Sequence, residues 1–104
     1  MENESQYITK KYTPEGVKFF LEGFICSLLA KELQEKLKEA LENGENKIIL
    51  NMLQVEYVCS IGISIILNTY KAAKKAGGIL KIEEPSENVR KVLAITSLDE
   101  LLIQ

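Results

Sequence analysis

Hydrophobic and polar positions follow two different periods along the chain, and the first segment has the pattern of a strand pair. Residues 6–12 and 17–21 combine β-branched and aromatic residues with lysines, which is typical of strands. Between them, Thr13-Pro14-Glu15-Gly16 places proline and glycine at favoured turn positions. We therefore predict an antiparallel hairpin whose first strand lies at a sheet edge.

The pattern then changes to a helical period. Leucine and alanine recur at spacings of three and four, which predicts an amphipathic helix with one apolar stripe: Leu29, Leu33, Leu37, Ala40 and Leu41. We expect Ser27 to be its N-cap and Asn43-Gly44 to end it.

The second half of the chain alternates strands and helices. Residues 47–50 form a short apolar run that is typical of a strand inside a sheet, and apolar positions continue to Cys59. A helix is predicted over about residues 60–76, ending at Gly77-Gly78. Its expected apolar side comprises Ile61, Ile65, Thr69, Ala72, Ala73 and Ala76. A strand is predicted over residues 79–82.

Two further helical segments are predicted at the C-terminal end. Pro85-Ser86 opens a helix with Val89, Val92 and Leu93 on one face. Ser97-Leu98-Asp99-Glu100 matches a capping box ahead of a last helical turn. The predicted order is therefore β-β-α-β-α-β-α-α over a single domain, residues 1–104. This order predicts an α/β fold, in which an N-terminal antiparallel hairpin and parallel strands form one mixed β-sheet packed with α-helices.

Composition narrows the possible functions. The chain of 104 residues has a net charge of −2 and no histidine, which argues against nucleic-acid binding and against histidine-based catalysis. Two cysteines, Cys26 and Cys59, cannot form a zinc site alone, and no glycine-rich phosphate loop precedes a helix. No apolar run reaches membrane-spanning length. We expect a cytoplasmic protein, a monomer or weak dimer, with no metal, cofactor or membrane partner.

Candidate chemistry is expected where the parallel strands end and the helices begin. Ser60 stands at the predicted start of a helix, with Gly62 just inside it. One interpretation is an N-cap serine. The other is an exposed serine that a kinase phosphorylates, adding about −1.5 to −2 charges.

The ordered set of segments resembles the STAS domain family, and within it the bacterial anti-sigma-factor antagonists. Residues 55–63 are similar to the family's phosphorylation loop, and residues 73–78 to the end of its second helix. Residues 89–93, with 98–101, match its C-terminal pattern. The resemblance extends from Tyr7 over nearly the whole chain.

This resemblance implies a non-enzymatic protein that binds an anti-sigma factor which is also a serine kinase, and that is switched by phosphorylation of Ser60. The residues expected to contact the partner are Gly23, Phe24, Cys26, Cys59, Ile61 and Gly62. Cys26, Cys59 and Asn51 stand where the family pattern has aspartate, and Ile61 stands where it has a second serine.

Two other function classes stay open. The loss of three carboxylates favours a scaffold of the same fold that is never phosphorylated and belongs to a larger signalling or transport assembly. A small thiol enzyme using Cys59 at a helix N-terminus is the third class, although the chain offers no histidine as a base.

Two side-chain placements are predicted beside the candidate serine. Phe24 is expected to pack in the core, with a role as partner anchor as the alternative. Cys26 and Cys59 are expected to be free thiols about 5 to 10 Å apart at the same end of the sheet.

Overall fold

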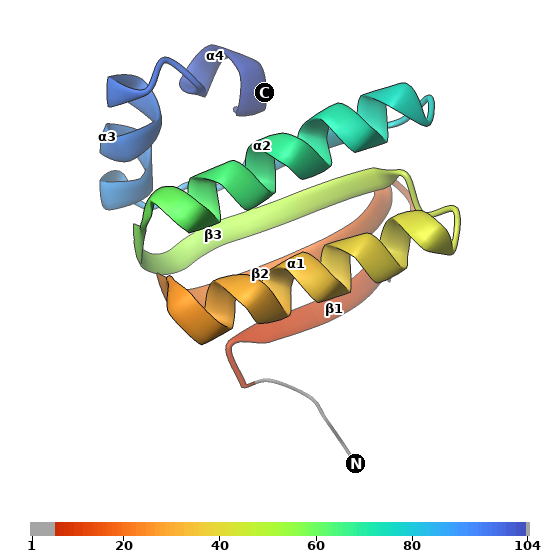
Figure 1. The fold of residues 1–104 in the computed structure, drawn as a ribbon, viewed down its shortest axis with the longest axis horizontal. Coiled ribbons are helices and arrows are strands. Elements are labelled where there is room, and N and C mark those ends of the chain that lie inside the picture. The colour runs from red at the N-terminus through yellow and green to blue at the C-terminus, as the bar shows by residue number, and fades with distance from the viewer. Residues whose placement is uncertain (1–5, 104) are drawn as a thin grey trace.

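The computed structural model describes residues 6–103, and its elements follow the predicted order (Figure 1). The strands and helices are β1 (Ile8–Thr13), β2 (Gly16–Ile25), α1 (Ser27–Glu42), β3 (Lys47–Val58), α2 (Ser60–Lys75), β4 (Ile79–Glu83), α3 (Glu87–Ile95) and α4 (Asp99–Leu102). The predicted fold class is therefore confirmed. β2 and β3 are longer than predicted. Each strand continues to the residue just before a cysteine.

The four strands form one sheet in the order β1-β2-β3-β4. β1 and β2 are antiparallel and are joined through a two-residue turn, since Thr13 pairs with Gly16. β2 pairs in parallel with β3, and β3 in parallel with β4. Residues 47–50 accordingly lie inside the sheet, as their continuous apolar run predicted.

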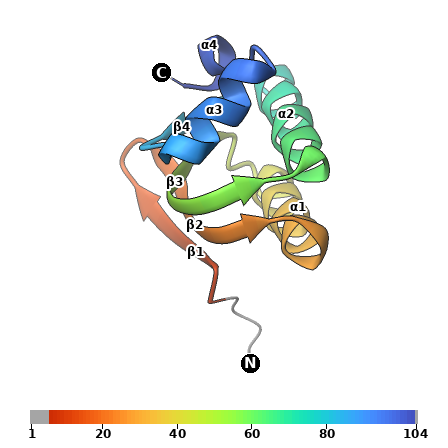
Figure 2. The same cartoon turned by 90° about the vertical axis from the view of Figure 1, so that its left-hand side faces the viewer.

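Helices α1 and α2 cover one face of this sheet (Figures 1 and 2). α1 buries Ala30, Leu33, Leu37 and Ala40, which recur at the helical spacing. Alternate residues of the strands face these helices, among them Phe19, Leu50 and Leu80, each completely buried. The main hydrophobic core therefore lies between the sheet and the helix pair.

α3 packs against the second half of β3, beyond the residues that pair with β4. Ser86 attaches it: its backbone N–H donates to the carbonyl of Met52 at 3.1 Å, and its hydroxyl donates to the carbonyl of Val55 at 2.6 Å. The same hydroxyl accepts from the N–H of Val89 at 3.2 Å, so the predicted N-terminal signal of this helix is confirmed.

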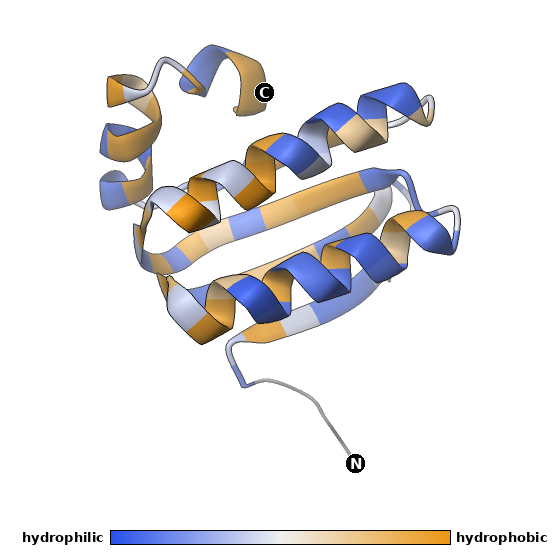
Figure 3. Ribbon diagram, viewed as in Figure 1, coloured by the Kyte–Doolittle hydropathy of each residue, from blue (hydrophilic) through white to orange (hydrophobic). Residues whose placement is uncertain are grey.

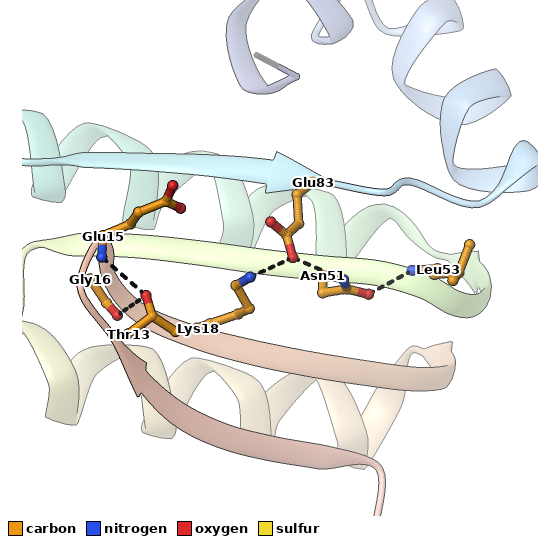
Figure 4. Close-up of polar contacts among 7 residues, drawn as sticks. All are labelled: Thr13, Glu15, Gly16, Lys18, Asn51, Leu53 and Glu83. Atoms are coloured by element: carbon orange, nitrogen blue, oxygen red, sulfur yellow. Dashed lines mark hydrogen bonds and ion pairs between the residues drawn. The ribbon is translucent and has the colours of Figure 1, made fainter.

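The other face of the sheet carries a polar network that joins three strands (Figure 4). Lys18 on β2 forms an ion pair of 2.9 Å with Glu83 on β4, and the side chain of Asn51 on β3 donates to the same carboxylate at 2.9 Å. These contacts hold the pKa of Glu83 below its usual value, mainly through the hydrogen bond from Asn51. Ile49, the register partner of Lys18 on β3, is 2% exposed.

Three local predictions are wrong. The N-cap of α1 is Cys26 and not Ser27, which adopts a left-handed conformation with φ of 48°. The N-cap of α4 is Leu98, and Ser97 is likewise left-handed with φ of 60°, so the capping box does not form. The third concerns α2, whose buried side differs from the apolar side that the sequence predicted.

α2 buries Gly62, Ile65, Ile66, Thr69 and Ala73. Ile61, Ala72 and Ala76, which were expected on that side, are exposed. The helix presents to the sheet the face on which its smallest residue, Gly62, lies, because this face permits the closest approach.

Candidate functional site

β2 and β3 end side by side, and each leads directly into a helix (Figure 2). Ile25 pairs with Val58, so Cys26 and Cys59 follow at equivalent positions of two neighbouring strands. The N–H of Cys59 donates to the carbonyl of Ile25 at 3.3 Å, which extends the strand pairing by one residue. The first turns of α1 and α2 therefore lie at the same edge of the sheet, as the element order predicted.

Gly62 determines how closely α2 approaches β2. A Cβ atom at this position would lie 2.6 Å from the carbonyl oxygen of Ile25 and 2.8 Å from a methyl group of Val58. Both separations are shorter than real Cβ contacts, so only glycine allows the first turn of α2 to pack here without displacing β2. Gly62 thus has a packing role in the candidate site.

Ser60 is the first residue of α2 and is exposed to solvent. The N-cap of the helix is Cys59, so the interpretation of Ser60 as an N-cap serine is wrong. Among residues 6–103 the Ser60 hydroxyl has no hydrogen-bond partner, and it is therefore available to an incoming group. Ile61 beside it is 52% exposed, while Gly62 is buried.

The electrostatic surroundings of Ser60 favour an added negative charge. Neither α1 nor α2 has an acidic residue in its first turn, so the partial positive charge of both N-termini is not neutralised locally. Residues 23–30 and 57–70 contain no lysine, arginine, aspartate or glutamate. A phosphate on Ser60 would be the dominant charge on this surface.

The two cysteines are free thiols, both partly buried, and the Cys59 thiol donates to the carbonyl oxygen of Ile25 at 3.4 Å. Burial opposes ionisation of Cys59, but hydrogen bonds from the Cys26 thiol and from backbone N–H groups, including that of Gly62, outweigh it and lower its pKa. The pKa of Cys26 is raised, chiefly by its hydrogen bond to Cys59 and also by burial. The prediction that both thiols lie at one end of the sheet is confirmed.

Exposed apolar side chains form a rim on the elements at this end of the sheet. It comprises Phe24, Leu28, Tyr57, Ile61 and Ile95, with exposed fractions between 45% and 84%. Phe24 and Tyr57 are register partners on neighbouring strands. Tyr57 and Ile95 also line a groove of about 400 Å³ between α2 and α3, and Ser60 forms part of its wall. In Figure 3 the first turns of α1 and α2 are pale to orange, whereas most of the outward side of α1 is blue, that is, hydrophilic.

The expected core position of Phe24 is wrong, because its side chain is 58% exposed. On β2 the residues that face the helices are Val17, Phe19, Leu21 and Ile25. Phe24 alternates with them and therefore points the other way. Gly23, also expected at the site, has a φ of 91° at an irregularity of the β2–β3 pairing, next to Phe24.

Three rim residues were not among the predicted site residues: Leu28, Tyr57 and Ile95. Leu28 lies one position off the leucine stripe of α1, and Ile95 lies off the face of α3 that buries Val89 and Leu93. These departures from the helical period were visible in the sequence and could have indicated exposed apolar side chains.

Asn51 does not belong to this site. It stands where the family pattern has aspartate, but β3 continues for seven residues beyond it, to Val58. At about 3.3 Å per residue this places Asn51 roughly 20 Å from the end of the strand. Its side chain instead takes part in the polar network with Lys18 and Glu83.

Neither metal ligands nor a membrane span are found in the part of the chain that the structure describes. Residues 6–103 contain no group of three or more cysteine, aspartate or glutamate side chains that could hold a metal ion. No helix within the same range is long and apolar enough to cross a bilayer.

Comparison with known proteins agrees with this geometry. Residues 7–103 match the model of the STAS domain family. The anti-sigma-B factor antagonist of Bacillus subtilis is 32% identical over 92 residues, which cover 88% of this chain and 84% of that protein. A Thermotoga neapolitana protein, whose name places it among the anti-sigma factor antagonists, is 38% identical over 64 residues. That match covers 62% of this chain and 57% of the relative's length.

Solved structures show the same fold. The anti-sigma factor antagonist SpoIIAA in its unphosphorylated form superimposes with a TM-score of 0.81 at 22% identity. The superposition covers 92% of this chain and 85% of SpoIIAA. The arrangement of strands and helices around the candidate site is therefore one that experimental structures contain.

Proposed function

Because the chain belongs to the STAS domain family, we propose that it acts as an anti-sigma factor antagonist, a regulatory protein without catalytic activity of its own. In this proposal it binds, in the cytoplasm, an anti-sigma factor that is also a serine kinase. Phosphorylation of Ser60 by that partner then weakens the complex. The observation that carries the proposal is an exposed, unpaired serine hydroxyl in the first turn of α2, at the end of the sheet where exposed apolar side chains form a rim.

The rim supplies the binding energy in this proposal. Phe24, Tyr57 and Ile61 present aromatic and branched side chains that are costly to leave in water and are typical of interface anchors. Removal of apolar area from water contributes about 25 cal/mol per Å². Gly62 and the two cysteines contribute shape, because they bring the two strand ends and the two helix starts together.

The proposed effect of phosphorylation on binding depends on the charge of the phosphate. A phosphoserine carries about −1.5 to −2 charges at neutral pH. In the free protein the N-terminus of α2 stabilises this charge, and water solvates it. In the complex the same charge would be buried against an apolar partner surface, and burying a charge without a counter-ion costs several kcal/mol. Phosphorylation at Ser60 therefore opposes binding.

A second candidate function is a scaffold of the same fold that is not phosphorylated. It is favoured by Cys26, Cys59 and Ile61, which stand at the site where the family pattern has aspartate and serine. The scaffold would use the same rim but would not need a free hydroxyl at Ser60.

Phosphorylation in vitro distinguishes the two functions. The protein is incubated with ATP and an anti-sigma factor kinase of the same organism that binds it, and the phosphorylated residue is located by mass spectrometry. We expect one phosphate, on Ser60, and none on the Ser60→Ala variant. Ser64→Ala is the matched control, because Ser64 is exposed one turn further along α2 and lines the same groove.

Binding measurements complete the test. Ser60→Glu should bind the partner more weakly than Ser60→Ala, since only the glutamate adds a charge that must be desolvated. A phosphate on another residue, or tight binding without any phosphorylation, would support the scaffold. Equal affinities of the two variants would contradict a switch based on charge.

A further inference from the structure

Cys26 and Cys59 stand side by side at the start of two helices, and the switch described above uses neither thiol. We propose that they form a peroxide-oxidisable pair, in which Cys59 is the reacting thiol and Cys26 the resolving thiol. Hydrogen peroxide would convert them into an intramolecular disulfide next to Ser60.

The backbone places the two residues at a separation that a disulfide requires. They directly follow the register partners Ile25 and Val58 on parallel strands. Neighbouring strands are about 4.8 Å apart, and the Cα atoms of a disulfide are usually about 4.4 to 6.8 Å apart. The Cys59 sulfur lies 3.4 Å from the carbonyl oxygen of Ile25, the residue that precedes Cys26.

The contacts of the two sulfurs assign them different roles. The thiolate is the reactive form of cysteine, and hydrogen bonds to the sulfur stabilise it. Burial raises the pKa of Cys59, but hydrogen bonding from the Cys26 thiol and from the backbone N–H groups of Gly62 and Ile61 lowers it by more. The pKa of Cys26 is raised, chiefly by its hydrogen bond to Cys59. The Cys59 thiol also donates to the carbonyl oxygen of Ile25 at 3.4 Å, a contact that is lost on ionisation. We assign the nucleophile to Cys59, at the start of α2, because it is the thiol of lower pKa.

Oxidant can reach the pair. Both cysteines are partly exposed, and hydrogen peroxide is a small neutral molecule. The first turns of α1 and α2 hold no acidic residue that would oppose formation of a thiolate.

One molecule of hydrogen peroxide accounts for all the atoms and electrons in the formation of the disulfide. The Cys59 thiolate attacks the peroxide, so an S–O bond forms, the O–O bond breaks, and the leaving hydroxide takes up a proton to give water. Cys26 then loses its proton and attacks the sulfur of the Cys59 sulfenic acid. An S–S bond forms, the S–O bond breaks, and the oxygen leaves as a second water. Two thiols supply the two electrons that reduce the peroxide.

The test counts thiols in the full chain after addition of one equivalent of hydrogen peroxide. We expect the loss of both thiols, a decrease in mass of about 2 Da, a chain that stays monomeric on a non-reducing gel, and recovery of both thiols with dithiothreitol. In Cys26→Ser the sulfenic acid on Cys59 should persist and react with dimedone. In Cys59→Ser the remaining thiol should be consumed at least about tenfold more slowly.

Unfolded protein is the matched control, because it has the same residues without the geometry. The wild-type chain in urea should be oxidised at the slow rate of Cys59→Ser. The proposal is overturned if the folded protein keeps both thiols, reacts no faster than in urea, or forms disulfide-linked dimers instead of an intramolecular bond. It is also overturned if Cys59→Ser reacts as fast as the wild type.

Discussion

Replacement of Gly62 by alanine tests the packing of the candidate site. In the interior of an exposed helix this change stabilises a protein by about 1 kcal/mol, because alanine has the higher helix propensity. Gly62, however, is buried in the first turn of α2, where its added methyl group would lie 2.6 Å from the Ile25 carbonyl oxygen. That carbonyl accepts hydrogen bonds from both the N–H and the thiol of Cys59, at 3.3 and 3.4 Å, so it cannot move freely.

The magnitude follows from two opposing terms. Overpacking a well-packed contact costs about 1 to 3 kcal/mol, and a separation of 2.6 Å from a backbone oxygen belongs to the upper part of that range, about 2 to 3 kcal/mol. The propensity gain offsets about 1 kcal/mol of this cost. We expect Gly62→Ala to lower the free energy of unfolding by about 1 to 2 kcal/mol. For a domain of this size that is a decrease in Tm of about 5 to 10 °C.

Urea and thermal unfolding measure this effect. Ser64→Ala is the matched control, because it also introduces alanine into the first half of α2, but at an exposed position. The control should change stability by less than about 0.5 kcal/mol. If Gly62→Ala is as stable as the wild type, or more stable, the close approach of α2 to β2 does not limit this position and the packing argument is wrong.

Three further predictions concern other parts of the structure. Ser86→Ala should cost about 1 to 2 kcal/mol in urea unfolding, because it removes the N-cap of α3 and its bond to the β3 backbone; an unchanged midpoint would contradict this. Glu83 has a lowered pKa in the folded state, so its stabilising effect is present above its unfolded pKa of about 4.3 and is lost as the pH falls through the folded value. Between about pH 6 and pH 3 the wild type should lose more stability than Glu83→Gln, and parallel curves would refute the role of the network. Phe24→Ala should change stability by less than about 0.5 kcal/mol but weaken partner binding, and a large loss of stability would instead indicate a core position.

Local and periodic features determined most of the elements from sequence alone. The leucine spacing of α1, the apolar run at residues 47–50 and the proline-glycine turn of the hairpin each have one favourable structure, because side-chain periodicity decides which face can be buried. The order of the elements then restricted the topology to a mixed sheet with parallel crossovers. Ser60 could be placed at a helix start for the same reason.

Contacts between distant elements decided the helix caps and strand lengths that side-chain periodicity does not predict. Ser27 and Ser97 have the residue type of an N-cap, but the chain direction imposed by the neighbouring elements puts both into left-handed conformations. The apolar run ends before Asn51, yet β3 continues to Val58 because it stays paired with β2 along this length. The local propensity of a segment contains no information about which other elements will pack or pair with it.

In the candidate site, too, some features were determined by the sequence and others by the packing of distant elements. The sequence by itself determined that Ser60, Cys26 and Cys59 lie at the carboxyl ends of strands, because this depends only on element order. The tertiary structure alone decided that Phe24 is exposed, that Ile95 of α3 lines the groove beside Ser60, and that the Cys59 thiol donates to the Ile25 carbonyl next to Cys26. Exposure and contact depend on distances between elements that are far apart in the chain, and these distances are set by packing against the whole core.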